Sequence, residues 1–360
     1  MKWFPGLMVA VALVLLPAYQ GEATNESQAG VLLLLIEPGA RVSGMGESFV
    51  TISDDATAAY YNPAGLSGQS RKELTFMHTK WLPAFVSDLY YEFLGYSQYL
   101  EGWGNIGINL TYFYLGRQTR TDEWGNELGT FTSYDAVFAV AYGSNLSSRT
   151  ALGVTVKYIY SHLAPRGAGA ERGAGVGHSI AFDLGVLHRS AVPGLKFGAA
   201  LHNLGPKIAY IDAAQADPLP LNFVVGASYK VLDTEFNDLL VTLDFYKPLV
   251  TRKDPFLKAV FTAWFDEYDR VKKDPDVKHP GREALQREWN EVDIHAGIEY
   301  VYSSLLALRA GYSYDRDGDL KFLTFGFGFQ FDWIEADFAY LPARGTGLEN
   351  NTRFSITVHF

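Results

Sequence analysis

The chain has 360 residues, a formal net charge of −10, an aromatic content of 15%, 35 glycines and no cysteine. The acidic balance argues against a nucleic-acid partner, which needs a basic protein face. The lack of cysteine excludes disulfides, thiolate metal sites and a cysteine nucleophile. The length fits either two ordinary domains or one large all-β unit.

Residues 1–23 have the composition of a secretory signal peptide. Lys2 precedes an apolar stretch from Leu7 to Leu16, and small residues follow at Gly21 and Ala23. This order predicts export and cleavage near Ala23. The alternative is a membrane anchor, but the apolar stretch is shorter than the ~20 residues that a spanning helix needs.

Residues 24–71 are rich in turn signals and precede the first predicted strand. Glycines at 39, 44 and 46 predict turns, and Asp54 or Asp55 is expected to cap a short helix. A second helix-start signal follows, in which Asn62 caps and proline opens a last turn that glycine ends. This motif consists of Asn62, Pro63, Ala64 and Gly65.

Residues 72–360 alternate between apolar and small or polar residues with a period of two, as strands do. In "LTFGFGFQF" (323–331), for example, leucine and four phenylalanines share one face, and threonine, glycines and glutamine share the other. The apolar faces end in aromatic residues, and the strands run to ~10 residues, the length that crosses a bilayer at a tilt. A soluble sandwich also alternates, but its strands are typically ~5–6 residues long. The pattern therefore predicts an all-β transmembrane antiparallel barrel.

The strand pattern divides the region into about fourteen strands joined by alternately short and long connections. Short turns on the periplasmic side and long loops outside are typical of bacterial outer-membrane barrels. The predicted strands lie at 73–81, 88–100, 104–117, 130–144, 150–163, 178–189, 194–204, 218–231, 238–250, 291–302, 305–315, 320–331, 333–341 and 351–360. Fourteen strands leave more space than inward side chains fill, so residues 24–71 are expected to fold into the lumen as a hatch.

Charged side chains at inward positions are expected to pair with one another inside the lumen. A carboxylate pair could serve acid–base catalysis, but buried charges in a barrel interior need partners for structural reasons alone. The scattered histidines do not predict a metal site, and we expect no enzyme activity, cofactor or metal. The inward charged residues and histidines are Lys157, Asp183, Asp244, Asp293, His295, Glu299, Arg309, Glu335, Asp337, Arg353 and His359.

The last strand and one insert carry further predictions. The last strand ends the chain with an apolar face of Phe354, Ile356, Val358 and Phe360, which resembles the assembly signal of outer-membrane barrels.

Residues 251–289 interrupt the strand pattern as an extracellular helical insert, with Asp254 as the expected cap and a second helical stretch from Pro280 to Trp289. The first helix carries an apolar stripe, which either caps the barrel rim or docks a partner protein. The stripe consists of Leu257, Val260, Phe261, Trp264, Phe265 and Tyr268.

The hatch sequence resembles that of FadL-like outer-membrane barrels, which carry an Asn-Pro-Ala element where this chain has residues 62–64. The stretch "LLLLIEPGARVSGMGESFVTISDDATAAYYNPAGL" and the later "LGVTVKYIYSHLA" are similar to the PorV branch, to which PorQ-type proteins are related. The resemblance implies a non-enzymatic outer-membrane component of the type IX secretion system. Such a protein takes secreted cargo by its C-terminal signal domain from the translocon barrel and passes it to the attachment machinery at the cell surface. The alternative is a FadL-type transporter of hydrophobic small molecules.

Overall fold

The computed structural model describes residues 29–360, apart from 84–85, 87, 123, 166–172, 252, 274–276, 317, 319 and 344–349. The predicted signal peptide, residues 1–23, lies outside this part of the chain. Among the described residues, none of the helices is both long and apolar enough to cross a bilayer.

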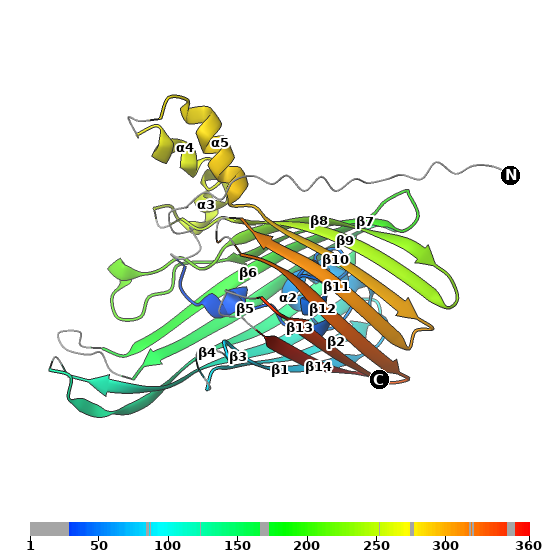
Figure 1. Ribbon diagram of the computed structural model, residues 1–360, viewed down its shortest axis with the longest axis horizontal. Coiled ribbons are helices and arrows are strands. Elements are labelled where there is room, and N and C mark those ends of the chain that lie inside the picture. Colours follow the sequence, from blue (N-terminus) through cyan, green and yellow to red (C-terminus); the bar gives the residue numbers. More distant parts are fainter. Residues whose placement is uncertain are drawn as a thin grey trace.

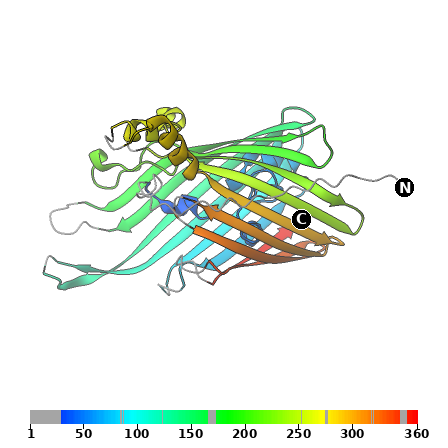
Figure 2. The same ribbon diagram turned by 45° about the horizontal axis from the view of Figure 1, so that its top comes forward.

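The strands form a closed antiparallel barrel in which each strand pairs with its neighbours in the sequence and β1 pairs with β14 (Figures 1 and 2). This confirms the predicted barrel of fourteen strands. The strands are β1 (Glu73–Lys80), β2 (Tyr90–Leu100), β3 (Gly104–Thr121), β4 (Glu127–Asn145), β5 (Thr150–Ala164), β6 (Gly175–Arg189), β7 (Leu195–Leu204), β8 (Asn222–Asp233), β9 (Asn237–Pro248), β10 (Asp293–Tyr302), β11 (Leu306–Asp315), β12 (Leu320–Phe331), β13 (Ile334–Leu341) and β14 (Asn351–His359).

Burial alternates along each strand, as the sequence pattern predicts. In β6, for instance, Ser179, Ala181 and Asp183 are buried in the interior, whereas Ile180, Phe182 and Leu184 are exposed on the outside. β3 and β4 are longer than expected because both continue past an irregularity near Tyr114 and Arg117, forming a hairpin that extends beyond the rest of the wall (Figure 1).

The connections divide the barrel into two ends. At one end, which we call the short-turn end, a few residues join β2 to β3, β4 to β5 and so on to β12 and β13. The opposite, long-loop end carries the β3–β4 hairpin tip, the β7–β8 connection and the helical insert between β9 and β10 (Figure 1). This is the asymmetry of outer-membrane barrels.

Among the residues that the structure describes, the hatch has four short helical segments and the insert has three helices. The hatch segments are η2 (Leu32–Leu35), α1 (Ala40–Gly44), α2 (Ala58–Tyr61) and η3 (Pro63–Gly68); η4 (Ala213–Gln215) lies in the β7–β8 connection. The insert helices are α3 (Phe256–Thr262), α4 (Asp266–Val271) and α5 (Pro280–Asn290). The expected single helix from Leu257 to Tyr268 is thus two helices with a break at Ala263–Phe265.

Three predicted helix boundaries are corrected. Thr57, not an aspartate, is the N-cap residue of α2, although the Asp55 carboxylate accepts a hydrogen bond from its backbone N–H at 2.8 Å. The turn that Pro63 opens runs on to Gly68 rather than ending at Gly65. Asp254 does not cap α3, because its carboxylate is bonded instead to Lys258 and Thr262.

Candidate functional site

The hatch backbone lies directly against glycines on the inner face of the barrel wall. A Cβ atom on Gly153 would lie 2.2 Å from the carbonyl carbon of Pro63, and one on Gly185 would lie 2.1 Å from Asn62 Oδ1. A Cβ atom on Gly143 would be 2.4 Å from the Pro63 oxygen. Any side chain at these positions would displace the hatch, so the glycines form its seat in the wall.

A second seat receives the turn after α1. Gly46 has a left-handed backbone with φ of 64°, and a Cβ atom on Gly311 would lie 1.9 Å from the Gly46 nitrogen. The Gly46 N–H donates to Thr324 Oγ1 at 3.0 Å, and its carbonyl oxygen lies 3.0 Å from His295 Nδ1. Glycine is required here both for the turn and for the close approach to the wall.

Asn62 joins three parts of the structure. Its Oδ1 accepts a hydrogen bond from Ala64 N at 3.1 Å, which caps η3, as expected for this residue type. Its Nδ2 donates to the carbonyl oxygens of Val50, within the hatch, at 2.8 Å and of Val186, in β6, at 3.1 Å. Position 65 requires glycine, because a Cβ atom there would lie 2.0 Å from the Ser53 carbonyl oxygen.

Arg41 connects the hatch to the charged part of the lumen. Its Nε and Nη2 atoms each donate to a different oxygen of Glu299 at 2.9 Å, the paired geometry that makes arginine–carboxylate contacts strong. Its Nη1 donates to Asp54 at 2.7 Å and to Asp55 at 3.4 Å. Both predicted hatch aspartates therefore bind an arginine of the same segment.

The network continues from Glu299 into the barrel wall. Arg309 donates to Glu299 at 2.6 Å and also binds Asp337, and all three side chains are almost fully buried. On the opposite wall, Lys157 forms a buried ion pair with Asp183 at 2.8 Å. These inward charges occur in pairs, which buried charges require.

Arg353 and Asp244 attach the hatch at two further points. Arg353 Nη1 donates to Glu37 O at 3.0 Å and to Ser43 Oγ at 2.7 Å. The Asp244 carboxylate accepts from Val50 N at 2.9 Å. The hatch is therefore held by charged side chains on several sides of the lumen.

A cavity of about 260 Å³ remains between hatch and wall. Its lining mixes apolar and charged side chains, including Leu34, Leu35, Tyr60, Trp81 and Phe322 together with Glu37, Lys157, Asp244, His295 and Arg353.

The apolar stripe of the insert is divided between two environments. Val260 packs with the buried Ala259 and Ala263 against barrel residues, and the Trp264 ring lies 5.9 Å from the Phe223 ring in a T-shaped contact. Leu257, Phe261 and Phe265 are 62%, 74% and 73% exposed. Tyr268, in α4, is also exposed and contacts the Lys272 ammonium group.

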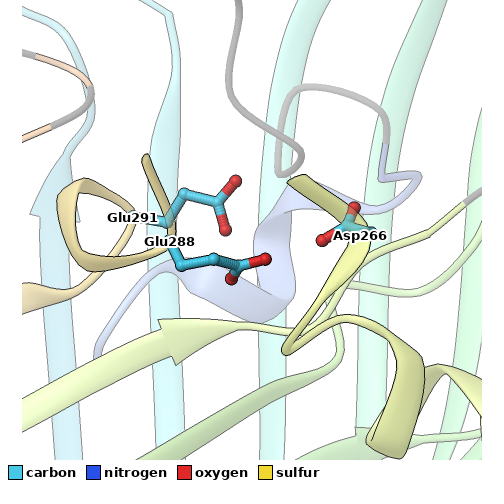
Figure 3. A group of neighbouring side chains, drawn as sticks. All are labelled: Asp266, Glu288 and Glu291. Carbon is cyan, nitrogen blue, oxygen red and sulfur yellow. The ribbon is translucent and has the colours of Figure 1, made fainter. Parts of the chain in front are cut away.

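An acidic cluster connects the insert to β9. The carboxylates of Asp266, Glu288 and Glu291 converge within 4.8 Å of one another (Figure 3). Such a group could hold a metal ion, but the Lys247 ammonium already binds Glu288 at 2.8 Å and also binds Glu291. Burial raises the pKa of Asp266 and raises the pKa of Glu291 to about 7. The cluster serves as the counter-ion of Lys247.

The predicted assembly-signal residues lie on the outer face of β14. Phe354 and Phe360 are exposed, and Ile356 and Val358 are half-buried, whereas the alternating Arg353, Ser355 and Thr357 are buried inside. Backbone hydrogen bonds join Phe360 to Lys72 in both directions, at 3.0 and 3.2 Å, so the last residue is tied to the start of β1.

Solved structures with a similar fold include a hydrocarbon channel. A TodX monoaromatic hydrocarbon channel with the deltaS2 mutation has a TM-score of 0.54 at 15% identity, covering 90% of this chain and 99% of the other. The Pseudomonas putida toluene transporter TodX gives 0.49 at 14% identity, covering 89% and 96%. A Pseudomonas aeruginosa FadL homologue gives 0.47 at 9% identity, covering 89% and 98%. No curated protein matches the chain in sequence.

The family comparison extends from the end of the predicted signal peptide into the start of the insert. Residues 20–254 match the model of the type IX secretion system protein PorV. This range contains the hatch and β1 to β9, and so includes the glycine seat and the Asn62 motif. The chain belongs to the PorV family of outer-membrane β-barrel proteins of the type IX secretion system.

Proposed function

We propose that this protein is a shuttle of the type IX secretion system. It binds the C-terminal signal domain of secreted cargo at the translocon and passes the cargo to the attachment machinery at the cell surface. The observation that carries the proposal is the family match, which spans the hatch and most of the barrel. The proposal includes a cleaved signal peptide at residues 1–23, a hatch at 24–71 and a barrel at 72–360.

The attachment of the hatch favours recognition at the surface over passage through the lumen. Opening the lumen would separate Arg41 from Glu299, with the loss of two charge-assisted hydrogen bonds, and would remove the hatch partners of the buried Arg353. Cargo would instead bind outside the barrel. The extended β3–β4 hairpin offers large exposed side chains there, among them Trp124 and Leu128, and such residues often dominate protein interfaces.

The second candidate is a FadL-type transporter, which the cavity beneath the long-loop end favours. Leu34, Leu35 and Phe322 in its lining could contact a hydrophobic molecule. However, the same lining includes Glu37, Lys157 and Arg353, and an apolar ligand cannot satisfy these charges.

A covalent lock on the hatch distinguishes the two candidates. Ser48 Oγ and Thr242 Oγ1 lie 3.0 Å apart, so cysteines at both positions are close enough for a disulfide between hatch and β9. The native chain has no cysteine that could compete. We expect a deletion strain to retain cargo inside the cell, and S48C/T242C to restore secretion with the disulfide formed.

The single variants S48C and T242C are the matched controls for the lock. Loss of secretion only in the oxidised double variant, with recovery on reduction, would contradict the shuttle proposal. If uptake of a hydrophobic probe also stopped when the disulfide formed and recovered when it was reduced, the transporter proposal would be favoured.

A further inference from the structure

The insert lies on the outside of the barrel wall. Phe223 and Lys247 are direct cross-strand partners on β8 and β9. On both strands the alternate residues, such as Asn222 and Asp244, are buried inside, so Phe223 and Lys247 point outward. The insert covers both, since Trp264 packs on Phe223 and Glu288 binds Lys247.

The wall next to this contact is the lipid-facing surface of the barrel. Val225 and Tyr229 follow Phe223 along the outer face of β8, and Leu243 lies on the outer face of β9. All three are exposed apolar side chains, as the outward band of a membrane barrel requires. Helix α3 therefore lies beside the long-loop edge of that band.

The surface of α3 divides into three sectors. Ala259, Val260 and Ala263 face the wall. Lys258 and Thr262 form a polar sector, in which both bind Asp254. Leu257 and Phe261, one turn apart, form a third sector that is apolar and exposed, and the exposed Phe265 follows in the break after the helix. A helix with wall-facing, polar and apolar exposed sectors can lie in a membrane interface.

Aromatic side chains at the long-loop end of the other strands form a belt. Rings of Tyr90, Tyr112, Tyr134, Tyr160 and His178, on successive strands β2 to β6, contact one another at centroid distances of 5.1–6.3 Å. Such belts lie at the membrane–water interface. On β7 and β8 the corresponding outer residues are Leu201, Leu204 and Phe223, and Val260 of α3 and Trp264 in the break after it cover them.

We propose that α3 continues this belt as an interfacial anchor, with Leu257, Phe261 and Phe265 inserted into the membrane leaflet at the long-loop end. Lipid is the occupant that continuity with the lipid-facing wall indicates. This proposal does not depend on cargo binding. A partner protein that covers the same face is the competing outcome.

Single-cysteine labelling tests the anchor directly, because the chain has no native cysteine. Phe261→Cys and Gln286→Cys, each labelled with the environment-sensitive dye NBD, are compared in nanodiscs of phosphatidylethanolamine and phosphatidylglycerol. Both positions are exposed, so labelling does not disturb packing, and position 286 on α5 is the matched control.

We expect nitroxide-labelled lipid to quench the dye at position 261 at least twofold more than at position 286, and aqueous iodide to do the reverse. Equal access of both dyes to iodide would overturn the proposal and would leave the face free for a protein partner. Phe265→Cys repeats the test at the exposed aromatic position that follows α3 and guards against a local effect of the label.

Discussion

At the residue scale, glycine decides how the hatch fits the lumen. Where the hatch backbone approaches the wall most closely, the wall carries no Cβ atom, and Gly153 is a clear case because a Cβ would lie 2.2 Å from the carbonyl carbon of Pro63. The hatch motif and its seat are therefore complementary parts of one contact between residues 62–65 and strands β4, β5 and β6.

Gly153→Ala is expected to displace η3 and destabilise the closed state by about 1–3 kcal/mol, the usual cost of overpacking. Single-channel recordings in planar bilayers should then show openings that the wild type lacks. Gly281→Ala, where a Cβ would meet nothing within 4 Å, should behave as the wild type. Silent recordings from Gly153→Ala, with the barrel intact, would show that this contact does not hold the lumen closed.

The sequence predicted some of these residue roles but not their partners. Asn62 could be assigned as a cap because its position before proline identifies that role locally. No local pattern indicates the bond from Arg41 to Glu299, because the residues are 258 positions apart and the conformation of the hatch joins them. Alternation predicts that Glu299 and Arg309 point inward, but it cannot identify the hatch residue that binds Glu299.

At the element scale, the insert shows why helical periodicity alone was insufficient. The pattern predicts one helix from Leu257 to Tyr268 and a second helical stretch from Pro280 to Trp289. In the structure the first is divided into α3 and α4, and the apolar stripe is partly packed on the barrel and partly exposed. The sequence does not indicate the role of Lys247. Its outward side chain is covered by α5, which begins more than 30 residues later in the chain.

Lys247→Met should release the insert from the wall. The variant keeps side-chain length but leaves Glu288 and Glu291 without the Lys247 ammonium group, and breaking a buried pair in this way costs about 3–5 kcal/mol. Hydrogen exchange in α4 and α5 should accelerate while β1 to β6 stay protected. The triple variant Lys247→Met/Glu288→Gln/Glu291→Gln should recover most of the protection. Unchanged exchange in Lys247→Met would show that other contacts hold the insert.

The closing strand provides a second test at this scale. Phe360 and Phe331 are 63% and 64% exposed near the short-turn end, so aspartate at either position removes a similar lipid contact. If the terminal aromatic is an assembly signal, Phe360→Asp should lower the amount of heat-modifiable barrel in outer membranes several-fold more than Phe331→Asp. Equal losses would indicate a general effect of charge on the lipid face.

At the scale of the whole molecule, the architecture was more predictable than the function. Strand number and order follow from period-two alternation and from connections that alternate in length, and both signals are repeated around the barrel. The closed barrel is shared with hydrocarbon channels, so the fold does not distinguish a shuttle from a transporter. That distinction depends on how firmly the hatch closes the lumen and on what binds at the long-loop end.

The most direct test of the shuttle proposal is the affinity of the purified protein for a cargo signal domain. A fluorescent protein fused to the C-terminal signal domain of a type IX cargo is titrated against the detergent-solubilised barrel, and the same fusion without that domain is the control. We predict saturable binding that requires the signal domain and is retained when the S48C/T242C disulfide locks the hatch. Equal binding of both fusions, or no binding of either, would contradict the role in cargo transfer.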